Sequence, residues 1–228
     1  MVRSTRQWSS VEEIRKGAEA GDPEAQRYLG VCFQTGQGMP QDNAEAVRWF
    51  RLAGEQNDPE ALCYLGVCHQ LGLGLPADLD EAAKCFREAA ELGDPAAQFN
   101  LGVLYETGQG VPQNYKEAVK WYQCAAERGE AQAQFNLGVF YESGEVLQQD
   151  FQEAVRWYEM AAEQGCAPAQ CNLGLCYETG RGVAKNQQEA KKWFLLAAKQ
   201  GDKTAQHNLG LYYASQQPPE LDEDAPPE

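Results

Sequence analysis

The chain of 228 residues carries a formal net charge of −15, which makes nucleic acid and anionic membrane surfaces unfavourable partners. Hydrophobic residues make up 43% of the sequence, enough apolar surface for a core, so disorder of the whole chain is excluded. No stretch reaches about eighteen consecutive apolar residues, the length that a membrane-spanning helix needs.

Residues 1–9 are predicted to form an N-terminal extension. They lack the apolar run of a secretory signal, so we expect a cytoplasmic protein whose eight cysteines are thiols in that reducing compartment. Ser10 and Glu13 form a capping-box pattern, which predicts a short capping helix over residues 10–20. Trp8 has two interpretations: it folds back over this end of the fold, or it docks a partner.

From residue 21 onward the sequence repeats itself every 36 residues. The pair Leu-Gly recurs six times at this spacing, beginning at Leu29, Leu65, Leu101, Leu137, Leu173 and Leu209. An unvarying period of this length indicates a solenoid built from one supersecondary motif. Five full repeats are predicted, over residues 21–56, 57–92, 93–128, 129–164 and 165–200.

Residues 93–128 show how each repeat is predicted to fold. Asp94 caps a first helix whose buried stripe includes Leu101, and a loop with two glycines and a proline ends that helix. Asn114 and Glu117 then form a capping box at the start of a second helix. The same box recurs as Asp42/Glu45, Asp78/Glu81, Asp150/Glu153 and Asn186/Glu189.

Small residues mark the places where helices must approach closely, and the Leu-Gly glycine is the most regular of them. A glycine also ends the second helix in four repeats, at the position expected to have left-handed backbone geometry. Asn57 replaces it once, and asparagine tolerates that conformation. The loop over residues 143–148 lacks the second glycine and the proline, so we expect local distortion there.

After the fifth repeat, residues 201–215 supply a first helix only. Leu209 and Tyr213 on this helix have no second helix to cover them, so the expected state is a monomer or a weak dimer through this end. Residues 216–228 are acidic and rich in proline, which predicts a disordered tail.

The sequence of residues 93–105, followed by Gly-Gln-Gly-Val-Pro at 108–112, resembles the typical motif of the Sel-1-like repeat family, a relative of the tetratricopeptide repeat. The resemblance implies an all-α fold, a right-handed α/α superhelical solenoid with its first helices on the concave side. It also implies a scaffold or adaptor that binds proteins and is not an enzyme. Fold alone does not determine function.

The cysteines are spaced unfavourably for a metal site or a disulfide. Cys166, Cys171 and Cys176 are five residues apart, which turns each by about 140° from the last on a helix, and no Cys-x-x-Cys occurs. Secreted cysteine-rich members of the resembled family pair cysteines eight residues apart, a spacing absent here. Buried free thiols that replace apolar side chains are expected, notably at Cys32, Cys68 and Cys176.

Catalytic, cofactor-binding and metal-binding residues are not predicted. His69 lies at a position that other repeats fill with tyrosine, and the repeat places no nucleophile beside it. The Gly-x-Gly pairs lie in loops between helices and lack the preceding strand of a dinucleotide site. The alternative is an enzyme, since some cysteine-rich relatives are associated with β-lactam binding or hydrolysis. A nitrocefin assay distinguishes the two.

The concave side of the first helices is the candidate binding surface. Amides and aromatic rings recur there at adjacent repeat positions and could bind an extended peptide. The candidate partner-binding residues are Tyr28, Tyr64, Phe99, Asn100, Phe135, Asn136, Asn172, His207 and Asn208. Glu106, Glu142 and Glu178 nearby favour a basic peptide. The alternative is structural: the amides bond neighbouring helices and the rings fill space between repeats.

Overall fold

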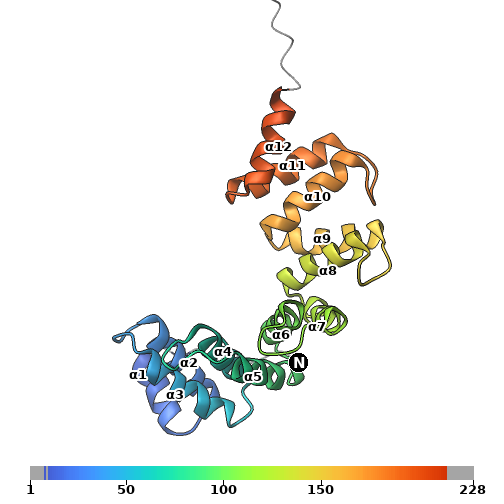
Figure 1. The fold of residues 1–228 in the computed structure, drawn as a ribbon. Coiled ribbons are helices and arrows are strands. Elements are labelled where there is room, and N and C mark those ends of the chain that lie inside the picture. The colour runs from blue at the N-terminus through green and yellow to red at the C-terminus, as the bar shows by residue number, and fades with distance from the viewer. Residues whose placement is uncertain (1–7, 9, 215–228) are drawn as a thin grey trace, which may run out of the picture. The chain divides into compact units, whose positions relative to one another are not determined.

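The computed structural model describes residue 8 and residues 10–214, and these residues fold into twelve helices without a strand (Figure 1). The predicted tail at 216–228 and the extension at 1–9, apart from Trp8, lie outside the described residues. In chain order the helices are α1 (Val11–Glu19), α2 (Pro23–Thr35), α3 (Asn43–Gly54), α4 (Pro59–Leu71), α5 (Leu79–Glu91), α6 (Pro95–Thr107), α7 (Tyr115–Glu127), α8 (Ala131–Ser143), α9 (Phe151–Glu163), α10 (Ala167–Thr179), α11 (Gln187–Lys199) and α12 (Lys203–Ala214).

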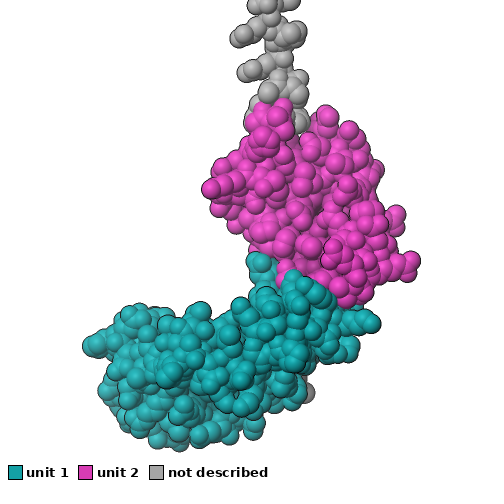
Figure 2. Space-filling model, in the orientation of Figure 1, with its two compact units in different colours: residues 1–133 teal, residues 134–228 magenta. Residues whose placement is uncertain are grey.

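Consecutive helices pack in pairs, which confirms the predicted all-α solenoid of helix–turn–helix repeats. Even-numbered helices are the first helices of the repeats, and odd-numbered helices are the second. The chain divides into two compact units, unit 1 over residues 1–133 and unit 2 over residues 134–228 (Figure 2). Within each unit, a helix contacts its neighbours along the chain, so the core continues from one helix pair to the next.

Aspartate caps begin the first helices of unit 1. The carboxylates of Asp22, Asp58 and Asp94 each accept a hydrogen bond from the backbone N–H three residues on, at 2.7–3.0 Å. These bonds satisfy amides that have no partner inside the helix. A proline in the first turn follows each of the three caps, where its missing N–H costs nothing.

The capping boxes of the second helices are half confirmed. In α7, Asn114 accepts from the N–H groups of Lys116 and Glu117, as predicted. The reciprocal bond is not the one expected, because the N–H of Asn114 donates to the carbonyl of Tyr105 at 2.8 Å. Glu117 instead pairs with Lys120, three residues on. The other four boxes have the same arrangement, so each cap ties its loop to the first helix.

The Leu-Gly glycines form sockets for aromatic rings of the following second helix. A β-carbon on Gly66 would lie 2.7 Å from the Phe86 ring, and one on Gly138 would lie 2.4 Å from the Tyr158 ring. Only glycine allows a ring to rest on the backbone in this way. Gly210 on α12 has nothing within 4 Å of the same point, because no second helix follows it in the described residues.

The N-terminal end of unit 1 is covered by Trp8, whose ring packs against Gly17 of α1 and joins the cluster around Ile14 and Leu29. This favours the interpretation in which Trp8 folds back. The predicted left-handed backbone is also present, with φ of 61° at Asn57 and 91° at the equivalent Gly93.

Candidate functional site

The candidate site lies on the first-helix face, which we define as the repeat positions of Cys63, Tyr64 and Val67. In unit 1 these positions hold Arg27, Tyr28 and Val31 on α2, Cys63, Tyr64 and Val67 on α4, and Phe99, Asn100 and Val103 on α6. In unit 2 they hold Phe135, Asn136 and Val139 on α8, Cys171, Asn172 and Leu175 on α10, and His207, Asn208 and Leu211 on α12. Of the nine predicted binding residues, Tyr64 and His207 are exposed and the others are half-buried.

Apolar side chains on this face remain in contact with solvent. Tyr64 is 36% exposed, Val139 39% and Leu211 58%. The ring of Tyr64 is supported from below, because it stacks on Phe50 with ring centroids 5.0 Å apart. The face therefore presents apolar surface that the core does not use.

Two of the predicted asparagines make contacts inside the fold. The side-chain nitrogen of Asn100 donates to the sulfur of Cys63 at 3.9 Å, and Asn172 hydrogen-bonds to the hydroxyl of Tyr158. The side-chain nitrogen of Asn208 is buried without a hydrogen-bond partner. These contacts agree with the structural alternative for Asn100 and Asn172, so the amides are weaker candidates than the exposed apolar side chains.

The glutamates predicted to favour a basic peptide differ in their surroundings. Glu106 accepts from the Tyr122 hydroxyl at 2.5 Å, and Glu142 accepts from the Tyr158 hydroxyl at 2.7 Å. Burial, together with the Glu142 carboxylate, raises the pKa of Tyr158 well above its usual range. Only Glu178 of the three glutamates is fully exposed.

Residues on the first-helix face occur in two coupled sets. In one set, a polar side chain contacts the aspartate that caps the next first helix: Arg27 binds Asp58, and the thiols of Cys63 and Cys171 hydrogen-bond to Asp94 and Asp202. In the other, Phe99 and Phe135 pack on Tyr122 and Tyr158, with ring centroids 5.8 Å and 6.0 Å apart. In this second set, Glu130 and Cys166 stand where the first set has a cap aspartate. Cys166 makes no side-chain cap. Our sequence analysis missed this coupling.

A second feature that the sequence analysis missed is a series of glutamine pairs, each of which joins a buried glutamine to an exposed one. The side-chain nitrogen of Gln56 donates to the side-chain oxygen of Gln26 at 2.9 Å, and Gln164 and Gln200 bind Gln134 and Gln170 in the same way. The two members of each pair are 30 residues apart. The two positions change together along the sequence, because leucine replaces glutamine at both Leu62 and Leu92. A comparison of residues 30 apart would therefore have revealed the pairs.

All eight cysteines are free, and seven of them are buried. Burial raises the pKa of the Cys68, Cys85 and Cys176 thiols to about 11, and burial with the Asp202 carboxylate raises that of Cys171 to about 12. The prediction of buried thiols as apolar filler at Cys32, Cys68 and Cys176 is thus confirmed. Thiols with such pKa values are weak nucleophiles near neutral pH.

Neither histidine lies in an evident catalytic arrangement. His69 is half-buried and its Nδ1 atom has no hydrogen-bond partner, while His207 is exposed. Among residues 8 and 10–214, no group of three His, Cys, Asp or Glu side chains could hold a metal ion. In the same part of the chain, every helix is too short or too polar to cross a membrane.

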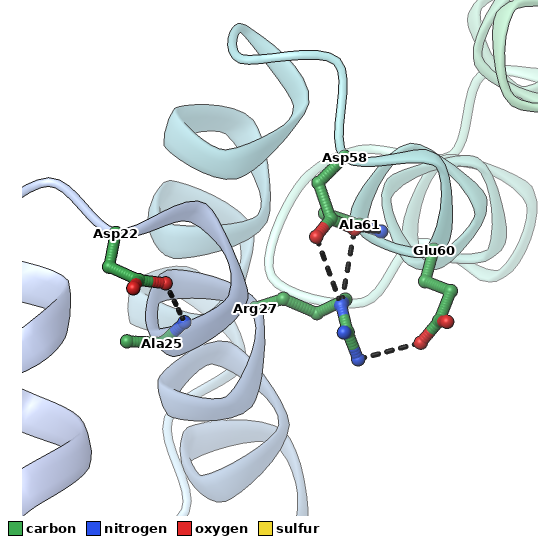
Figure 3. A network of polar contacts seen from close by, with 6 residues as sticks. All are labelled: Asp22, Ala25, Arg27, Asp58, Glu60 and Ala61. Carbon is green, nitrogen blue, oxygen red and sulfur yellow. Dashed lines mark hydrogen bonds and ion pairs between the residues drawn. The ribbon is translucent and has the colours of Figure 1, made fainter. Parts of the chain in front are cut away.

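A pocket of about 250 Å³ opens on the first-helix face of unit 1, between α4 and the start of α6. It is lined by Glu60, Cys63, Tyr64, Val67, Asp94, Ala96 and Asn100. Two of the predicted binding residues, Tyr64 and Asn100, are among them. Beside this pocket, Arg27 of α2 forms an ion-pair network with Asp58 and Glu60 (Figure 3).

Comparisons with known proteins agree with this architecture. The Sel1 repeat family model matches residues 23–58, 59–94, 95–130, 131–166 and 167–202. These ranges have the predicted period and begin two residues later than the predicted repeats. Comparison with curated protein sequences finds no match.

Solved structures of repeat proteins are similar along most of the chain. A Sel1 repeat protein of Oxalobacter formigenes is 37% identical, with a TM-score of 0.80 over 90% of both chains. A protective antigen of uropathogenic Escherichia coli with an SLR fold is 34% identical, with a TM-score of 0.82 over 90% of this chain and 44% of that one. The chain therefore spans less than half of that antigen. An immunity protein of Pseudomonas aeruginosa, 22% identical with a TM-score of 0.56, shares the fold alone.

Proposed function

This chain belongs to the Sel1 repeat family, and from that premise we propose that it is an interaction scaffold whose first-helix face binds a peptide segment of a partner protein. Proteins with this fold are commonly protein-interaction scaffolds. The observation that carries the proposal is that both units expose apolar side chains at these repeat positions, Tyr64 in unit 1 and Val139 and Leu211 in unit 2. Apolar side chains that recur on one face and are not used by the core mark interaction sites.

The thiols support a scaffold more than an enzyme. Two cysteines, Cys63 and Cys171, lie on the first-helix face, and both are buried and hydrogen-bonded to aspartate, which favours the neutral thiol. Free cysteines also go with a reducing compartment, so a cytoplasmic location is part of this proposal.

A charge placed on the exposed apolar positions of the first-helix face tests the proposal. The double variant Val139→Glu with Leu211→Glu is expected to lose the capture of a partner from a host lysate, measured by mass spectrometry. The matched control is Met160→Glu with Leu196→Glu, since these residues of α9 and α11 are 44% and 37% exposed on second helices of the same unit. Equal loss in both double variants, at unchanged melting temperature, would contradict a site on the first-helix face.

A second candidate function is self-association through α12. It is favoured by the empty socket at Gly210, which in the five preceding repeats holds an aromatic ring. Light scattering over a hundredfold range of protein concentration tests it. A molar mass that rises with concentration and returns to the monomer value in Gly210→Glu is the expected result, and a monomer at all concentrations contradicts it.

A further inference from the structure

The first repeat contains a built-in example of how this face holds a cation. Arg27 of α2 reaches the N-terminal end of α4, where its Nε atom lies 3.1 Å from an Asp58 carboxylate oxygen and its Nη1 atom 2.6 Å from a Glu60 oxygen (Figure 3). Only 12% of the Arg27 side chain is exposed. The cap aspartate of one first helix thus binds a guanidinium supplied by the preceding first helix.

One repeat later the guanidinium is missing, the cap aspartate remains, and Ala96 stands in place of Glu60. Cys63 of α4 occupies the position of Arg27, and Asp94, which caps α6, occupies that of Asp58. A thiol is much shorter than an arginine side chain. The Cys63 thiol hydrogen-bonds to Asp94, and both residues line the pocket of about 250 Å³. Pockets for small molecules usually measure about 300–1,000 Å³, so this one fits a single long side chain.

The pocket has the chemistry that a guanidinium needs. Asp94 and Glu60 supply two carboxylates, and Asp94 is only 4% exposed, so solvent screens its charge weakly. Glu60 borders both sites, because it pairs with Arg27 and also lines the pocket together with Asp94. The exposed ring of Tyr64 adds an aromatic wall on which a guanidinium can stack.

We propose that the pocket between α4 and α6 binds the arginine side chain of a partner peptide, which takes beside Asp94 the place that Arg27 takes beside Asp58. The inference rests on the proposed scaffold function and names the chemistry of its partner. It is specific to this position, because the equivalent pair Cys171 and Asp202 has Pro168 in place of Glu60 and Asn172 in place of Tyr64.

The probe is an acetylated and amidated Gly-Arg-Gly peptide, titrated into the full chain and followed by ¹⁵N-edited NMR. Amide signals of Cys63, Tyr64 and Ala96 are expected to shift. The same peptide with citrulline, a neutral isostere of arginine, is expected to bind at least about tenfold more weakly, because it loses the charge-assisted bonds. Equal binding of the two peptides, or shifts only at other residues, overturns the proposal.

Two variants separate the pocket from the fold. Cys63→Arg supplies the chain's own guanidinium and should abolish binding, while the control Cys171→Arg should leave it unchanged. Asp94→Asn keeps a good helix cap and removes the charge, so binding should weaken about tenfold at an unchanged melting temperature. Unchanged binding in Cys63→Arg overturns the proposal. Failure here would leave the scaffold function intact, because that function is tested at Val139 and Leu211 in the other unit.

Discussion

The two compact units use the same repeat but differ in how completely its buried glutamines are paired. In unit 2, Gln134 and Gln170 each accept a hydrogen bond from the glutamine 30 residues later. In unit 1, one pair is replaced by Leu62 and Leu92. Gln98 is left with a buried side-chain oxygen that has no partner, because Arg128 stands where the second glutamine belongs.

The first-helix face differs between repeats, and each unit contains both a phenylalanine and a cysteine at the same repeat position. In unit 2, the Phe135 ring packs on Tyr158, whose hydroxyl is bound by Glu142, so the space between helices is filled. Phe99 packs on Tyr122 in the same way in unit 1, whereas one repeat earlier Cys63 is small and a pocket remains. The backbone period therefore fixes where side chains lie, whereas coupled substitutions decide whether the space between them is closed or open to a ligand.

The largest expected effect is a loss of stability when a glycine socket is filled, and it should be equal in the two units. Gly66→Ala and Gly138→Ala would each force a β-carbon to within 2.7 Å of an aromatic ring. Overpacking of this kind should lower the free energy of unfolding by about 3 kcal/mol in both cases. Gly210→Ala is the control, with open space at the same point, and it should be neutral or slightly stabilising. Urea denaturation measures all three, and a large loss in Gly210→Ala would contradict the socket model.

The next effect separates the two coupled sets. Tyr158→Phe in unit 2 removes the hydroxyl that binds Glu142 and Asn172, which should cost about 2 kcal/mol. The reverse change, Phe194→Tyr, should stabilise the chain, because the new hydroxyl would face the unpaired nitrogen of Asn208. Thermal unfolding of both variants provides the measurement. Stability changes of opposite sign in the two variants would support the distinction between the two coupled sets, and changes of the same sign would contradict it.

A smaller effect should repair the difference in glutamine pairing. Arg128→Gln supplies the missing partner for the buried oxygen of Gln98, so the free energy of unfolding should rise by about 1 kcal/mol. Arg128 loses only an exposed hydrogen bond to the carbonyl of Cys124. A lower stability in chemical denaturation would show that the unpaired oxygen has another partner in solution, such as water.

The smallest effect per residue is the pH dependence of the buried thiols. Folding raises the pKa of Cys68, Cys85 and Cys176 from 9.0 to about 11, so their contribution to stability is complete below pH 9 and is lost as the pH rises towards 11. At pH 9 each thiol should already lower the free energy of unfolding by about 0.4 kcal/mol relative to pH 7, because at that pH it ionises only in the unfolded state. Unfolding free energies measured between pH 7 and pH 10 check this, and replacing Cys68 by Ala should reduce the slope.

Much of the fold could be predicted from the sequence because its signals are local. A cap residue such as Asn114, a turn glycine and the stripe containing Leu101 all act within one helix or turn, and the fixed period repeats them. The left-handed Asn57 could be placed for the same reason. The capping boxes were only half right, because the N–H of Asn114 has a competing carbonyl, that of Tyr105, which folding brings near.

The candidate site was harder to predict because its contacts join different helices. Glu106 appeared to be a free acid, yet it binds Tyr122, which lies on the next helix. The role of Cys63 depends on Asp94 and on what Arg27 does one repeat earlier. Position within the repeat indicated which residues share the face. Only the packed helices show which of their side chains already have a bonding partner within the protein.

The glycine sockets also give this protein a set of spectroscopic markers. A glycine that lies under an aromatic ring experiences a ring-current field, so the α-proton resonances of Gly30, Gly66, Gly102, Gly138 and Gly174 should move upfield, and those of Gly210 should not. Each shifted signal reports one helix pair. Following them during denaturation would show whether the repeats melt one by one or together, without introducing any label.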